Sequence, residues 1–187
     1  MILSLSEILD VLVMTAVVGY IFTGLFKFHR EEIITGFDWQ GFKFACMVTA
    51  PALIFHELAH KFVAISYGMQ ATFHTAYTWL GLGIIMKLLH FGFIFFVPAY
   101  VSIGCGIEPC TLKPLSSAMI AFAGPAANLL IFLVCWALLK NPNLKRSTRI
   151  ILYISKQINL FLFIFNMLPI PMFDGLKVYQ GLWEAFF

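Results

Sequence analysis

Charged residues are scarce in this sequence: Asp, Glu, Lys and Arg together make up 11% of its 187 positions. Hydrophobic residues make up 61%, and 21 positions are Phe. A soluble globular domain carries about 25% charged residues, so this composition excludes an ordinary soluble domain and predicts a protein surrounded mainly by lipid. The net charge is only +3, and the sequence contains no long basic run. We therefore expect no binding of nucleic acid.

Cysteine is also scarce, with four residues in the chain. Cys46 and Cys135 lie in apolar segments, whereas Cys105 and Cys110 flank a turn spelled C-G-I-E-P-C. That pair could form a disulfide or bind a metal, but we favour two unrelated thiols. The first residues lack a basic segment, so we expect no cleavable signal and expect Met1 to begin the mature protein.

Four apolar segments are long enough to cross the roughly 30 Å hydrocarbon core of a bilayer. They cover approximately residues 5–28, 42–67, 115–139 and 149–168. A charged stop at 27–32 follows the first segment, and a basic tip joins the last two segments as a helical hairpin. The sequence therefore predicts an α-helical polytopic membrane protein with about four transmembrane helices.

Residues 68–114, between the second and third spans, are interpreted as strands and not as a fifth span. Apolar and polar residues alternate over 72–79 with period two, and Phe93–Val101 is aromatic and β-branched with glycine and proline nearby. We expect a small membrane-associated β-sheet, shielded by protein or lining a wet cavity. The alternative is a kinked helix over 84–103.

A motif of ionisable residues, H-E-L-A-H, lies within the second span as His56, Glu57 and His60. Residues four apart share one face of a helix, so the two imidazoles can bind one Zn²⁺ while Glu57 reaches a bound water. Such groups are costly in a lipid-buried helix unless a metal or a function compensates them. The alternative is a buried polar patch in which Glu57 pairs with Lys61. We predict one Zn²⁺ per chain, used for peptide hydrolysis.

A hydrolytic zinc site needs a third protein ligand and an open fourth position. Asp174 is the best candidate, because Pro169 and Pro171 break the fourth span just before it and force an unwound segment. The alternative is that Asp174 caps a short final helix.

Two asparagines, Asn128 and Asn166, lie inside otherwise apolar segments. Either side chain could hydrogen-bond a substrate backbone or stabilise an oxyanion. For Asn128, a polar contact that joins helices beside small residues is at least as reasonable. Asn166 is the stronger functional candidate, because it lies at the proline break.

Three motifs, H-E-L-A-H at 56–60, G-P-A-A-N at 124–128 and N-x-x-P-x-P-x-x-D-G at 166–175, resemble those of the site-2 protease family of intramembrane zinc metalloproteases. The resemblance implies that His56, His60 and Asp174 bind zinc. It also implies that Glu57 is the catalytic base and that Asn166 lies near the substrate.

The resemblance covers approximately residues 42–176, which would form the metalloprotease core. Residues 1–41 would then be a first transmembrane helix with a polar loop, and 177–187 a short C-terminal segment. The implied function is an endopeptidase that cuts a peptide bond within or near a transmembrane helix of a substrate protein. Small residues on the spans are compatible with an oligomer, and the sequence assigns no particular oligomeric state.

Lys and Arg crowd the end of the spans opposite the motif, and the positive-inside rule would make that end cytoplasmic. The family resemblance implies instead a buried site nearer the cytoplasmic face, and we adopt this orientation. The alternative function is a metal-ion or proton transporter that uses the same ionisable residues. It is disfavoured because no repeat relates the first two spans to the last two.

Overall fold

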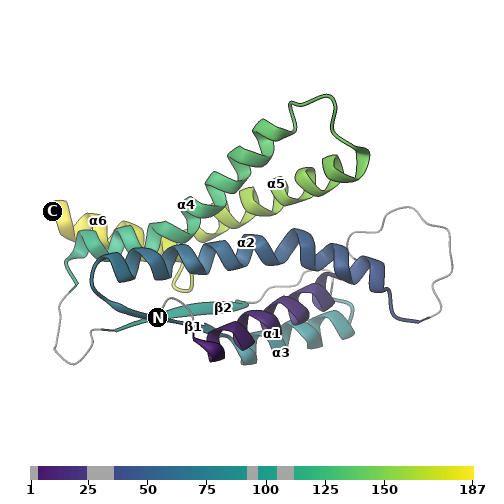
Figure 1. Ribbon diagram of the computed structural model, residues 1–187. Helices are drawn as coiled ribbons and strands as arrows, with labels where there is room; N and C mark the ends of the chain where they lie inside the picture. The colour runs from purple at the N-terminus through teal and green to yellow at the C-terminus, as the bar shows by residue number, and fades with distance from the viewer. Residues whose placement is uncertain (1–3, 25–35, 92–96, 105–111) are drawn as a thin grey trace. The chain divides into compact units, whose positions relative to one another are not determined.

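The computed structural model describes residues 4–24, 36–91, 97–104 and 112–187 (Figure 1). Within them, six helices and two strands follow in the order α1 (Leu5–Phe22), α2 (Trp39–Ser66), β1 (Gln70–Thr75), α3 (Tyr77–Leu88), β2 (Ala99–Gly104), α4 (Pro114–Leu138), α5 (Arg146–Asn166) and α6 (Asp174–Phe186). Helices α1, α2, α4 and α5 are long and apolar enough to cross a membrane. The mostly helical fold with four long apolar helices is as predicted.

The predicted small sheet is present, as an antiparallel pair of β1 and β2, but it is shorter than the sequence indicated. The expected strand through Tyr77 and Trp79 was wrong, because both residues lie in helix α3. The alternation of apolar and polar residues ends there, and the following apolar run is long enough for a helix. Helix α3 also overlaps the start of the alternative kinked helix, whereas Ala99–Gly104 is a strand.

Some predictions fall on residues outside the described ranges. They are the charged stop at 27–32, the first part of the predicted strand at 93–96, and the pair Cys105 and Cys110.

The described chain forms two compact units, and the boundary between them falls within α2 and within the sheet. The first unit contains α1, α2 up to Leu53, and α3. Near both of its ends, α1 is joined by hydrogen bonds to residues in or next to α3. Near its start, the Asp10 carboxylate accepts from the Thr75 backbone N–H at 3.2 Å and from the Tyr77 hydroxyl at 2.5 Å. At its end, the Lys87 ammonium donates to the backbone carbonyls of Tyr20 and Thr23.

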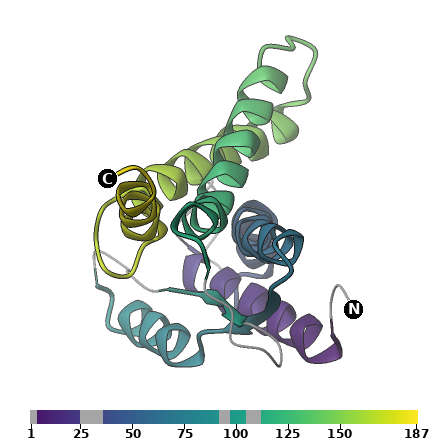
Figure 2. The ribbon, with the colours of Figure 1, turned by 90° about the vertical axis from the view of Figure 1, so that its left-hand side faces the viewer.

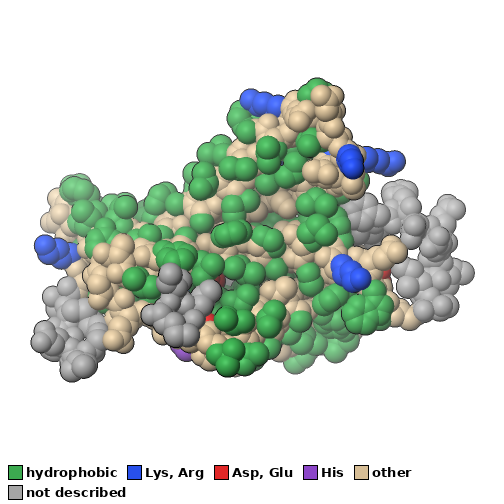
Figure 3. All heavy atoms as spheres, in the orientation of Figure 1, with side chains coloured by type: hydrophobic (Ala, Val, Ile, Leu, Met, Phe, Trp, Pro, Cys, Tyr) green, Lys and Arg blue, Asp and Glu red, His purple; other side chains and the backbone are tan. Residues whose placement is uncertain are grey.

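The second unit contains α2 from Ile54 onward, together with α4, α5 and α6. Helix α4 lies beside α6 near its start and beside α5 further along (Figure 1 and Figure 2). The approach of α6 requires Gly181, because a Cβ atom there would stand 2.5 Å from the Pro114 carbonyl oxygen. Helices α4 and α5 form the predicted hairpin, and Lys and Arg side chains gather at its tip (Figure 3).

Hydrophobic side chains cover much of the molecular face shown in Figure 3. Large apolar side chains of α4 and α5 are well exposed, including Leu130 at 61% and Phe161 at 54%. Extended apolar surfaces of this kind mark contact with a membrane or with partner proteins.

Candidate metal centre

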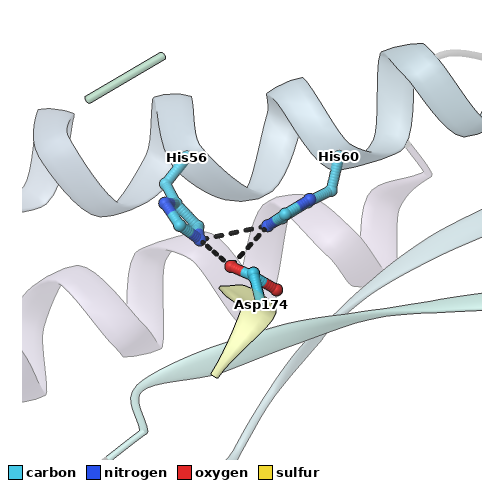
Figure 4. Close-up of side chains that lie close together, drawn as sticks. All are labelled: His56, His60 and Asp174. Carbon is cyan, nitrogen blue, oxygen red and sulfur yellow. Dashed lines mark hydrogen bonds and ion pairs between the residues drawn. The ribbon is translucent and has the colours of Figure 1, made fainter. Parts of the chain in front are cut away.

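His56 and His60 lie one turn apart on the same face of α2, in the second unit. Each residue is 7% exposed. Their ring centroids are 4.7 Å apart, and their Nε2 atoms are 3.0 Å apart. The spacing of four residues, read from the sequence, therefore brings both imidazoles to one point (Figure 4).

Asp174 reaches the same point from the first position of α6. Its Oδ2 atom lies 3.1 Å from His56 Nε2 and 3.2 Å from His60 Nε2 (Figure 4). Asp174 does not act as the N-cap of α6, because Phe173 occupies that position without a side-chain cap. The carboxylate points at the imidazoles instead, so the three side chains form one group of possible metal ligands.

The hydrogen bond that Nδ1 makes in each ring determines whether Nε2 carries a proton or a lone pair. His60 Nδ1 donates to the backbone carbonyl of Ile120 at 2.7 Å, and a carbonyl can only accept. His56 Nδ1 donates to the Asn128 amide oxygen at 2.6 Å. In the neutral rings this network assigns the proton to Nδ1 and leaves a lone pair on each Nε2. Two lone pairs and a carboxylate oxygen therefore converge, and a cation would satisfy all three.

The three ligand atoms also suit zinc in their separations. With bonds of about 2.0–2.2 Å, ligand atoms around a tetrahedral zinc lie roughly 3.3–3.6 Å apart. The observed edges of 3.0, 3.1 and 3.2 Å are only slightly shorter. Burial opposes ionisation of Asp174, but when both imidazoles are protonated their Nε2–H groups outweigh it and hold the pKa of this carboxyl below its usual range; a cation in place of those protons would act in the same direction. Two imidazole nitrogens and an ionised carboxylate fit Zn²⁺.

One face of α4 supports the imidazole pair. Ile120, Gly124 and Asn128 recur every four residues, so they lie along one side of the helix. Ile120 supplies the carbonyl for His60, and Asn128 supplies the amide oxygen for His56. Between them, Gly124 has no side chain, and a Cβ atom there would stand 2.6 Å from His56 Nε2. The G-P-A-A-N motif thus contributes space as well as a hydrogen bond.

Glu57, the predicted base, is 8% exposed and adjoins His56 in the chain. Asn166 is half-buried at the last turn of α5, and its side chain belongs to none of the hydrogen bonds among the described residues.

Asn159 is a residue of this network that the sequence analysis missed. Its amide oxygen accepts from Asn128 Nδ2 at 2.9 Å, and it is 1% exposed. Like Asn128 and Asn166, it is an asparagine within an apolar segment, and this pattern could have identified it in the sequence.

Comparisons with known proteins give one informative similarity. No family model matches the sequence, and no solved structure matches it. A protein of Methanocaldococcus jannaschii that bears the name "putative zinc metalloprotease" is 34% identical over 186 residues, which is 98% of this chain and 87% of that protein. The similarity therefore extends far beyond the short motifs. The chain belongs to the zinc metalloprotease family that this M. jannaschii protein represents.

Proposed function

We propose that this protein is a zinc endopeptidase of the site-2 protease type, which hydrolyses a peptide bond within or near a transmembrane helix of a substrate protein. The observation that carries the proposal is the convergence of His56 Nε2, His60 Nε2 and Asp174 Oδ2 beside the buried Glu57. The metalloprotease name of the M. jannaschii relative supports it.

His56, His60 and Asp174 would hold the ion and leave a fourth position open. Zinc supplies Lewis acidity, which makes water a nucleophile at neutral pH and polarises a peptide carbonyl. Glu57 takes the proton from the attacking water and passes it to the leaving amine. The Nδ1–H bonds to Ile120 and Asn128 hold the rings so that both Nε2 atoms stay available for the ion.

The proposed setting within a bilayer is supported by the length of α2. Its 28 residues span about 42 Å, which exceeds the roughly 30 Å hydrocarbon core. His56 lies about 26 Å from the Trp39 end of the helix and about 15 Å from the Ser66 end. The site would therefore lie within the membrane, and we propose that it is nearer the cytoplasmic face.

A transmembrane substrate would need to unwind before cleavage, because the carbonyl groups of a helix are bonded internally. The unwound segment could pair with the outer edge of β2 by β-augmentation. Tyr100 of this strand is 52% exposed, so its side chain is accessible to a partner, whereas Ala99 is buried.

The test is to purify the protein, measure bound zinc, and follow cleavage of a membrane protein substrate reconstituted in vesicles. We expect Glu57→Gln to retain zinc but to cleave about 100-fold or more slowly. We expect Asp174→Asn to lose both zinc and cleavage, because it removes the charged ligand. Glu184→Gln, an exposed carboxylate of α6, is the matched control and should resemble the wild type.

Cleavage by Glu57→Gln at the wild-type rate would refute the proposed base. Transport of zinc or protons into the vesicles with no cleavage products would instead establish the transporter alternative.

A further inference from the structure

We propose that Asn159 is a positioning residue that acts through Asn128 to keep His56 in the tautomer that binds the metal. This inference rests on the proposed zinc site. It assigns a role to a residue of α5 that lies outside the three sequence motifs.

The burial of Asn159 is the first observation. Helix α5 is largely uncovered, and Tyr153 and Phe161 on it are more than half exposed. Asn159 on the same helix is 1% exposed, and its partner Asn128 is 0% exposed. Burying a side-chain amide costs free energy unless all of its hydrogen bonds are made. An apolar side chain at position 159 would avoid this desolvation cost, so the buried amide points to a specific role.

The direction of the hydrogen bonds is the second observation. The chain begins at the backbone carbonyl of Ser155, which can only accept, and Asn159 Nδ2 donates to it at 2.8 Å. This bond turns the Asn159 amide oxygen towards Asn128, whose Nδ2 donates to it at 2.9 Å. The Asn128 amide oxygen is thereby turned towards His56, which donates from Nδ1 at 2.6 Å.

The side-chain amides of Asn159 and Asn128 therefore each have one orientation in which all of these hydrogen bonds are made. If Asn128 rotated by half a turn, its NH₂ group would face His56 Nδ1, which would then have to accept. The ring proton would move to Nε2, and the lone pair that binds a metal would be lost. Asn159 prevents this rotation, because its oxygen can accept from Asn128 but cannot donate to it.

His60 needs no such chain. Its Nδ1 donates directly to the Ile120 carbonyl, so a single backbone group fixes its tautomer. The two ligands on α2 are thus oriented by different means, and loss of Asn159 should affect His56 alone.

The experiment measures zinc affinity by competition with a chelator, and the visible absorption spectrum of the cobalt-substituted protein, in detergent. Asn159→Leu keeps the approximate volume and removes the acceptor for Asn128. We expect zinc affinity to fall about 10- to 100-fold and the cobalt spectrum to change. Gln157→Leu, which removes an exposed amide from the same helix, is the control and should match the wild type in both measurements.

The double variant Asn128→Asp with Asn159→Leu separates positioning from packing. A carboxylate offers only acceptors to His56, so it needs no neighbour to orient it, and the double variant should recover zinc affinity. A purely structural role for Asn159 predicts no recovery. If Asn159→Leu does not fold, Asn159→Ala removes the same acceptor without filling the space and should lower zinc affinity in the same way.

Wild-type zinc affinity and an unchanged cobalt spectrum in Asn159→Leu, or in Asn159→Ala where the leucine variant does not fold, would overturn the proposal. Absence of zinc binding by the wild-type protein would refute the metal site itself, and with it this role of Asn159.

Discussion

Gly124 of α4 lies so close to His60 of α2 that a Cβ atom at position 124 would stand 2.2 Å from the imidazole Nε2. The backbone of α4 is therefore packed directly against the atoms proposed to bind the metal. This close approach also brings the Ile120 carbonyl and the Asn128 amide within hydrogen-bonding distance of the two rings.

Substitution of Gly124 by Ala should therefore abolish zinc binding, because the new methyl group would occupy the place of the converging nitrogen atoms. Overpacking of this kind typically costs about 1–3 kcal/mol, which the helices can relieve only by moving the rings apart. Zinc content of the purified variant is the measurement. Gly81→Ala, in helix α3 with open space around the new Cβ atom, is the control and should leave zinc content unchanged. Full zinc occupancy in Gly124→Ala would contradict the described packing.

The residue after Asp174 should be equally sensitive. A Cβ atom at Gly175 would stand 2.5 Å from the carbonyl carbon and oxygen of Met167, which are backbone atoms and cannot swing away. Gly175→Ala must therefore displace the first turn of α6 and, with it, the Asp174 carboxylate. We expect reduced zinc affinity together with a lower midpoint of thermal unfolding.

A comparison with Tyr179→Phe shows whether this effect is specific. The Tyr179 hydroxyl donates to the Met167 carbonyl at 3.0 Å, so its removal loosens the same contact without adding volume. Tyr179→Phe should lower stability by about 0.5–1.5 kcal/mol and leave zinc bound. Equal loss of zinc in both variants would show that the position of Asp174 does not depend on Gly175 in particular.

The outer edge of β2 is open to a direct test with proline. Adjacent residues of a strand direct their N–H groups to opposite edges, so prolines at Tyr100 and Val101 remove one N–H from each side. If a substrate adds to this edge, the variant that loses the outward N–H should cleave more slowly while its zinc content stays normal. Unchanged cleavage in both variants would exclude β-augmentation at this strand.

The Asp10 network in the first unit should matter for stability and not for metal binding. Tyr77→Phe removes the hydroxyl that donates to the Asp10 carboxylate at 2.5 Å, whereas the Thr75 backbone N–H still donates to it. We expect the midpoint of thermal unfolding to fall slightly, because a hydrogen bond to a charged group is lost, and the exposure of Tyr77 keeps the effect small. Zinc content should not change. A drop in zinc content would show that the two units are energetically linked.

Local patterns in the sequence predicted much of the fold. The four long apolar segments became four long helices, because length and composition are properties of each segment alone. The facing of His56 and His60 follows from the helical repeat in the same way. The strand expected through Tyr77 and Trp79 was wrong, because a short alternating pattern does not outweigh a longer apolar run.

The sequence by itself determined which residues could form a metal site and that one helix would present two of them. Only the tertiary structure decided which groups meet them, because the contacts join residues far apart in the chain. Asp174 lies 118 positions from His56, and Ile120 lies 60 positions from His60. The proposed positioning role of Asn159 also depends on the tertiary structure, because the orientation of an amide is set by the partners that packing places around it.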